Sequence, residues 1–163
     1  MKGKFFWASL VILVVVLAFL LPQAYVKLLM MKEVSTLGYR RVKMSVSVVD
    51  DAGMIKLYDG CMGVRMLITK KQAVSIARGL KGELKGRPNM HDIFATIAKN
   101  FGLKVVMVKV DDLKDGVYYA KLIVAMKGKM MGVDSRPSDA IAIAVRSDAP
   151  IYVKNSLLQN LCK

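Results

Sequence analysis

The stretch VDSRPSDAIAIAV, residues 133–145, decides how the second half of this chain is expected to fold. Pro137 suits the first turn of a helix, and Asp139 then lies where a carboxylate complements the helix dipole. The isoleucines that follow alternate with alanine, which resembles a strand, but alanine is a poor strand former. We therefore expect a strand, a sharp corner and a buried helix.

Working outward, period-2 alternation predicts strands and 3.6-residue spacing predicts helices. Glycine and aspartate clusters supply the turns between them. The segment 155–161 is expected to form a terminal helix turn capped by Asn155 or Ser156. The expected strands are 41–50, 54–60, 63–69, 104–113, 117–126, 130–134 and 150–153, and the other expected helices are 70–80 and 91–102.

Three strands followed by a helix occur twice in this order. A shift of 67 residues aligns Ala73 and Ile76 with Ala140 and Ile143, which suggests a duplicated β-β-β-α unit. The fold class predicted is α+β with a mainly antiparallel or mixed sheet, plus one N-terminal transmembrane helix.

The transmembrane helix is predicted from FFWASLVILVVVLAFLLPQAYV, residues 5–26, which carries no charge. A helix needs roughly 20 apolar residues to cross a bilayer. A cleaved signal peptide is the alternative, but its apolar core is shorter, and Pro22 stands where its cleavage site wants a small residue. The expected organisation is a tail (1–4), the helix (5–26), a linker (27–41) and a domain (42–163).

Charge and cysteine content bear on the compartment. More lysines and arginines follow the predicted span than precede it, so the positive-inside rule places a single-pass protein with its domain in the cytoplasm. Cys61 and Cys162 fit no metal-ligand spacing. Two free thiols in a reducing compartment are expected, with one disulfide as the alternative.

The chain is strongly basic, with a net charge of +14, and the excess extends beyond the N-terminus. A basic domain favours polyanionic partners, either RNA or DNA, or anionic lipid. The alternative is a solvated basic face without a ligand.

The quoted stretch also contains a candidate site. An arginine beside a helix N-terminus binds anions, as Arg136 and Ser138 would here. Two carboxylates, Asp134 and Asp139, can hold a divalent cation such as Mg²⁺ or Mn²⁺. The alternative is that these residues only cap and start the helix.

A second cluster, GRPNMHD, residues 86–92, shares this pattern of Arg-Pro, a short polar step and an acid. His91, the single histidine, would be a general base or a metal ligand, and Arg87 would grip phosphate. The alternative is a helix N-cap at Asn89 or His91 with Asp92 as the capping acid. If the two clusters form one site, His91 or Asp92 lies within about 12 Å of the first cluster.

At these residues the chain resembles the bifunctional nuclease domain family. The similar stretches are RPNMHDI (87–93), VDDLKDGVYYAKLIV (110–124) and VDSRPSDAIAIAVRSDAPIYV (133–153), within a resemblance that covers 42–158. The resemblance implies an α+β fold, a dimer, and nuclease activity on RNA and DNA. The sequence departs from the family pattern at 70–72, where an acid is usual, and at Met90, which replaces a hydroxyl residue.

Two functions follow as expectations. In a membrane-anchored nuclease, the catalytic residues would be His91, Asp92, Asp134 and Asp139; Arg87, Arg136 and Ser138 would bind substrate; and Asp134 and Asp139 would bind Mg²⁺ or Mn²⁺. In a non-catalytic module, the same motifs would be structural corners, and the basic surface would bind nucleic acid, lipid headgroups or a protein.

Overall fold

The computed structural model describes residues 34–83 and 86–162, together with positions 14, 16–18, 20–22 and 25. The unit Thr36–Lys163 is compact in itself. Within the described positions, no helix combines the length and the apolar character that a membrane crossing requires. The predicted membrane helix at 5–26 lies largely outside these positions.

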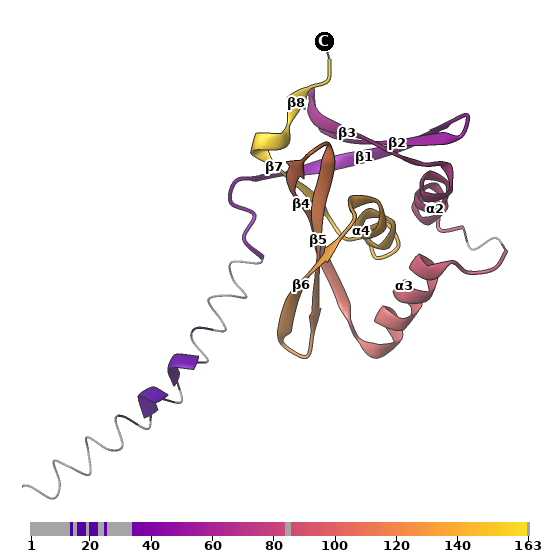
Figure 1. Ribbon diagram of the computed structural model, residues 1–163. Coiled ribbons are helices and arrows are strands. Elements are labelled where there is room, and N and C mark those ends of the chain that lie inside the picture. The colour runs from indigo at the N-terminus through magenta and orange to yellow at the C-terminus, as the bar shows by residue number, and fades with distance from the viewer. Residues whose placement is uncertain are drawn as a thin grey trace, which may run out of the picture. The chain divides into compact units, whose positions relative to one another are not determined.

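Eight strands of the described residues form one mixed sheet that curls around the helices (Figure 1). Their order is β6-β5-β4-β7-β1-β2-β3-β8. Among the described strands, β4 and β7 pair in parallel and all other neighbours are antiparallel. The α+β class with a mixed sheet is therefore confirmed. The strands are β1 (Tyr39–Val49), β2 (Ala52–Asp59), β3 (Met62–Thr69), β4 (Lys104–Lys114), β5 (Val117–Met126), β6 (Lys129–Ser135), β7 (Ile151–Lys154) and β8 (Gln159–Asn160).

Strand β1 joins the two halves of the sheet. Its first residues, Tyr39 to Val42, pair with β7, and Lys43 to Val49 pair with β2. Each half is a three-stranded antiparallel meander, β1–β3 and β4–β6, and each leads into a helix. Those helices are α2 (Lys70–Leu80) and α4 (Pro137–Ala144), with α3 (Met90–Phe101) between the halves in sequence.

The two halves are related by the same 67-residue shift that the sequence suggested. The N-caps of α2 and α4 are Thr69 and Arg136, which are 67 positions apart. Gln72 and Asp139 therefore occupy the same third position of their helices. The order of three strands and a helix thus occurs twice, as predicted.

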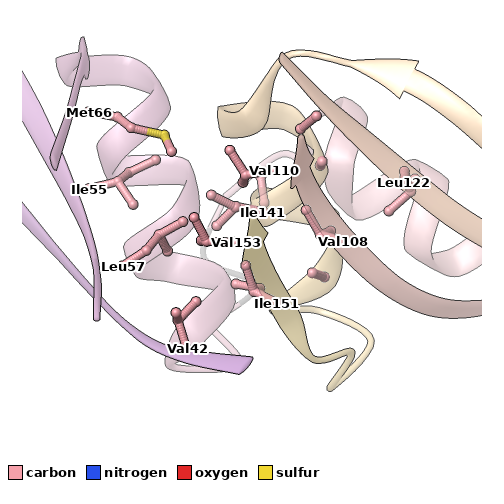
Figure 2. Packing of buried hydrophobic residues seen from close by; sticks show 14 of the residues in the cluster. Val42, Ile55, Leu57, Met66, Val108, Val110, Leu122, Ile141, Ile151 and Val153 are labelled. Carbon is pink, nitrogen blue, oxygen red and sulfur yellow. The ribbon is translucent and has the colours of Figure 1, made fainter. Parts of the chain in front are cut away.

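The apolar core lies where the halves meet, with α4 at its centre. Figure 2 shows Ile141 of α4 and Val153 of β7 between the side chains of the first meander and those of the second. Ile141, Ile55 and Val108 are fully buried. Because α4 contacts α2, α3, β4 and β5, its small alanines allow neighbours to approach closely. The start of α4 is thereby fixed against both halves.

The apolar face of α3 is not the face that packs. Helical spacing predicts Ile93, Phe94, Ile97 and Phe101 on one apolar face, yet all of them except Phe94 are between 42% and 75% exposed. Phe94 packs against the core, and Asp92 and Ala98 are buried. Helix α3 contacts the α4 region through the polar pairs His91–Asp139 and Asp92–Arg146. The face of α3 that packs is therefore not the face that its apolar residues suggest.

The C-terminal segment corrects two predictions. Asn155–Leu157 is a 3₁₀ turn without a side-chain cap, and the chain then adds strand β8 against the start of β3. This pairing brings the C-terminus beside the β2–β3 turn, and Cys61 and Cys162 form a disulfide with Cα atoms 5.3 Å apart. The expectation of two free thiols is therefore wrong. The two cysteines are far apart in sequence, and only the β8–β3 pairing brings them together. A bond that closes a loop of this length stabilises a fold by about 2–5 kcal/mol.

Candidate active site

The start of α4 directs its polar side chains toward other elements. Arg136 is the N-cap, but its side chain makes no capping hydrogen bond. Its Nε donates instead to Asp139 Oδ2 at 2.6 Å. The other oxygen, Asp139 Oδ1, lies 3.4 Å from Nε2 of His91 on α3. The carboxylate of Asp139 therefore joins the two predicted clusters.

The expectation that the clusters lie together is confirmed by this His91–Asp139 contact. Both side chains are partly accessible, with exposed fractions of 20% for His91 and 28% for Asp139. The Arg136 side chain is 74% exposed. The arrangement therefore places a cation, a carboxylate and an imidazole at one edge of the molecule where a solvent-borne ligand can reach them.

The hydrogen bonds of Ser75 favour one tautomer of His91. Ser75 Oγ accepts from Asn89 Nδ2 at 3.0 Å and from the Arg146 guanidinium at 3.4 Å. A hydroxyl has two acceptor lone pairs and one proton to donate. Its proton is thus left for His91 Nδ1, 3.1 Å away. Neutral His91 then carries its own proton on Nε2, facing Asp139.

Gln72 connects the start of α2 to the same place. Its Oε1 accepts from the Thr69 backbone at 2.9 Å, which completes a capping box. Its Nε2 donates to Ser138 Oγ at 3.0 Å. Ser138 is buried, so the predicted substrate-binding hydroxyl faces Gln72. Gln72, which belongs to the departure from the family pattern at 70–72, therefore lies beside Ser138 at the start of α4.

Asp92 takes a different direction from its neighbour His91. Asp92 Oδ2 accepts from the Asn89 backbone at 2.8 Å, and Oδ1 accepts from Arg146 Nε at 2.7 Å. Both partners of this ion pair are at least 93% buried. Burial alone raises the pKa of Asp92, but the hydrogen bonds from Asn89 and Arg146 outweigh it and hold the pKa below 3.8. Asp92 is thus a carboxylate that binds α3 to α4.

Two predicted site residues lie apart from this contact. Arg87 is exposed in the loop before α3. Asp134 is exposed on β6, in register with Lys121 of β5. Across the described residues, no group of three or more histidine, cysteine, aspartate or glutamate side chains is arranged to hold a metal ion. The metal-binding role of Asp134 and Asp139 stays a prediction.

Sequence reasoning missed the residues that support His91. Ser75 lies within an apolar helix, Asn89 has the residue type of a helix cap, and Arg146 lies inside the similar stretch 133–153 without a role predicted for it. Arg146 also donates to the Ser75 carbonyl at 3.1 Å, so it ties α4 to α2 as well as to α3. The available signal was polarity, because Ser75 interrupts the apolar stripe that Ala73 and Ile76 define.

The similarity to known proteins agrees with this geometry. A family model described as the bifunctional nuclease domain matches residues 57–162, which is more than half of the chain. The chain belongs to the bifunctional nuclease domain family. The matched range contains α2, α3 and α4, and hence every residue of the His91–Asp139 cluster.

Several known proteins are similar to part of the chain. An uncharacterized protein of Mycobacterium tuberculosis is 36% identical over 91 residues, which cover 56% of this chain and 54% of that protein. Bifunctional nuclease 1 of Arabidopsis thaliana is 28% identical over 108 residues, covering 64% of this chain and 33% of that protein. Bifunctional nuclease 1 of Oryza sativa is 24% identical over 125 residues, covering 74% and 38%. The chain therefore spans about half or less of the length of these relatives.

Proposed function

We propose that this chain is a nuclease that hydrolyses phosphodiester bonds in RNA, DNA or both. The observation that carries the proposal is the contact of His91 and Asp139, with Arg136 on the other oxygen of the same carboxylate. Phosphodiester hydrolysis needs a cation for the phosphate, a proton acceptor for the water and a proton donor for the leaving oxygen. Membership of the bifunctional nuclease domain family supports this assignment.

In the proposed reaction, Arg136 binds the phosphate through its exposed guanidinium. A water molecule attacks phosphorus and gives its proton to the Asp139 carboxylate. The bond between phosphorus and the leaving oxygen breaks, and Asp139 gives that oxygen the proton it took from the water. His91 Nε2–H donates to the Asp139 carboxylate and orients it. Ser75 holds the imidazole through Nδ1, and Asn89 in turn donates to Ser75 Oγ, so both are positioning residues.

We also propose metal assistance by Mg²⁺ or Mn²⁺, with Asp139 and Asp134 as the carboxylate ligands. Such ions prefer carboxylate oxygens. Both oxygens of Asp139 are engaged here, by His91 and by Arg136, so the ion would have to replace one of these partners. The proposed reaction of the preceding paragraph does not depend on it.

The test is a nuclease assay on the full chain in a non-ionic detergent. Labelled single-stranded RNA and DNA are incubated with Mg²⁺, Mn²⁺ or EDTA. Wild type is compared with Asp139→Asn and with Asp59→Asn, which removes an exposed carboxylate on β2 that pairs with Arg40. We expect cleavage by wild type and Asp59→Asn, and a loss of about 10²–10⁴-fold in Asp139→Asn. Equal cleavage by all three would indicate a contaminating enzyme and would overturn the proposal.

A non-catalytic binding module is the second candidate, and specific contacts favour it. Gln72 stands beside Ser138 where the family pattern has an acid, and Asp92 is bound in a buried ion pair. The side chains of Gln72 and Asp92 therefore serve structure. Nucleic-acid binding without cleavage under all metal conditions would support this candidate over the nuclease.

The setting of the domain also belongs to the proposal. We propose that residues 5–26 anchor the protein in a membrane and that it forms a dimer. Flanking charge favours a cytoplasmic domain, whereas disulfides such as Cys61–Cys162 persist mainly in oxidising compartments. Protease treatment of sealed right-side-out vesicles decides between the two sides of the membrane, because digestion from outside would contradict the cytoplasmic assignment.

Analytical ultracentrifugation in detergent tests the dimer.

A further inference from the structure

A groove of about 480 Å³ adjoins the candidate active site. Its walls come from β3, from the β4–β5 turn and from the start of α4. Of the residues described along its walls, two are arginines, Arg65 and Arg136, and none is an aspartate or a glutamate. A groove with cations and without carboxylates favours an anionic ligand, and its volume suits a nucleotide-sized group.

Arg136 belongs to both the groove and the candidate site. Its Nε holds Asp139, while the side chain as a whole is 74% exposed and lines the groove. Ser138 and Gln72 line the same groove and are joined by a hydrogen bond. A phosphate bound to the Arg136 guanidinium would therefore lie at the junction between the groove and Asp139.

The apolar part of the groove offers a surface for a base. Tyr118 lines it and is half-buried against the core. Beside Tyr118, Val117 is 56% exposed, and Leu67 on β3 is 77% exposed. An aromatic ring next to guanidinium groups is the combination on which unpaired bases stack while their phosphates are held.

Arg65 is held in place from outside the groove. Its guanidinium donates to the Leu161 carbonyl at 3.3 Å, and Leu161 N in turn donates to the Cys61 carbonyl at 2.7 Å. The Cys61–Cys162 disulfide fixes this segment against β3. The second cation of the groove is thus positioned before a ligand arrives, which lowers the entropy cost of binding.

We propose that this groove binds single-stranded nucleic acid, with a base against Tyr118 and successive phosphates on Arg65 and Arg136. The strand then leads the scissile phosphate to Asp139 and His91. This inference rests on the proposed nuclease function and names its substrate class. A duplex, whose bases are paired and stacked inside, does not offer a free base to Tyr118.

The experiment measures binding separately from cleavage. The full chain in non-ionic detergent is titrated against a fluorescein-labelled single-stranded DNA of about 12 nucleotides, with EDTA present, and the DNA is checked for integrity on a gel. Fluorescence anisotropy gives the dissociation constant at several salt concentrations. A duplex of the same sequence and vesicles of anionic phospholipid without DNA are the competing ligands.

Tyr118→Leu is expected to weaken single-strand binding about tenfold, whereas Tyr118→Phe keeps the ring and retains affinity. Arg65→Gln is expected to reduce the slope of log affinity against log salt by about 0.7, the loss of one phosphate contact. Arg41→Gln is the matched control, because Arg41 is an exposed arginine of β1 that does not line the groove. Arg41→Gln removes the same net charge as Arg65→Gln. A larger effect of Arg65→Gln on binding would therefore come from the place of Arg65 in the groove.

Equal affinity of wild type, Tyr118→Leu and Arg65→Gln would overturn the groove assignment, as would a duplex or vesicles that compete as well as the single strand. If wild type cleaves nucleic acid in that case, the proposed nuclease function still stands. Groove-dependent binding without cleavage would support the groove and overturn the nuclease. The two failures are therefore distinguishable.

Discussion

The starts of α3 and α4 share a sequence pattern but differ in what their acids contact. Each has an Arg-Pro pair, a short polar step and an aspartate at the third helical position, Asp92 or Asp139. Asp92 is 4% exposed and binds its own N-cap backbone and Arg146. Asp139 is 28% exposed and binds His91 of another helix and the exposed Arg136.

The difference shows that position in a helix does not determine the role of a carboxylate. Asp92 satisfies backbone donors and neutralises a buried cation, so its value is structural. Asp139 leaves its own helix end without a side-chain cap and faces solvent beside an imidazole. A carboxylate that makes no capping hydrogen bond and is partly exposed beside a titratable group is the better candidate for function.

The largest expected effect is on stability, from breaking the Asp92–Arg146 pair. Asp92→Asn leaves the Arg146 guanidinium charged and buried without a counter-ion, so we expect a loss of about 3–5 kcal/mol in the free energy of unfolding. Urea denaturation measures it. The double variant Asp92→Leu with Arg146→Met removes both charges and is expected to recover most of the loss. A single variant as stable as wild type would contradict the structural role of Asp92.

The pH dependence of stability sharpens the same assignment. The folded state holds the pKa of Asp92 below 3.8, so its contribution is present above pH 3.8 and is lost as the pH falls through the lowered value. The difference in unfolding free energy between wild type and Asp92→Asn is therefore expected to be constant near neutral pH and to shrink below about pH 4. A difference that persists unchanged at pH 2 would argue against an ionised Asp92 in the folded protein.

The smallest expected effects are on the free energy of unfolding, when the N-caps of α3 and α4 are replaced. The Asn89 side chain accepts from two backbone amides of α3, so Asn89→Ala is expected to cost about 1 kcal/mol. Arg136 makes no such bond, and its exposed ion pair contributes little, so Arg136→Ala is expected to change stability by less than about 0.5 kcal/mol. Thermal or urea unfolding of both variants tests this order, and equal losses would remove the contrast between the two helix starts.

Much of the fold could be predicted because its signals are local. The helix at 70–80 was predicted with the bounds of α2, and the hairpin strands of both meanders were predicted to within two residues of the observed ends. Hairpin turns use Asp115-Gly116 and Lys127-Gly128 with positive φ values, which Gly tolerates readily. The meeting of His91 with Asp139 followed from the shared pattern of the two motifs.

The features that sequence did not predict depend on long-range pairing. The Cys61–Cys162 disulfide requires β8 to return to β3, and two strand residues give no readable pattern. The exposed stripe of α3 and the Ser75 hydrogen bonds depend on which face of α3 packs. That face is set by the contact of Asp92 with Arg146, which lies 54 residues further along the chain. Single-sequence periodicity contains no information on such contacts.

The central claim is that Asp139 serves catalysis and Asp92 serves structure. The most direct test measures cleavage rate and unfolding free energy on the same preparation of Asp139→Asn. We predict that cleavage falls by about 10²–10⁴-fold while stability changes by no more than about 1 kcal/mol, because the lost contacts are partly exposed. Asp139→Asn protein that cleaves like wild type, or that loses activity only because it unfolds, would contradict this account.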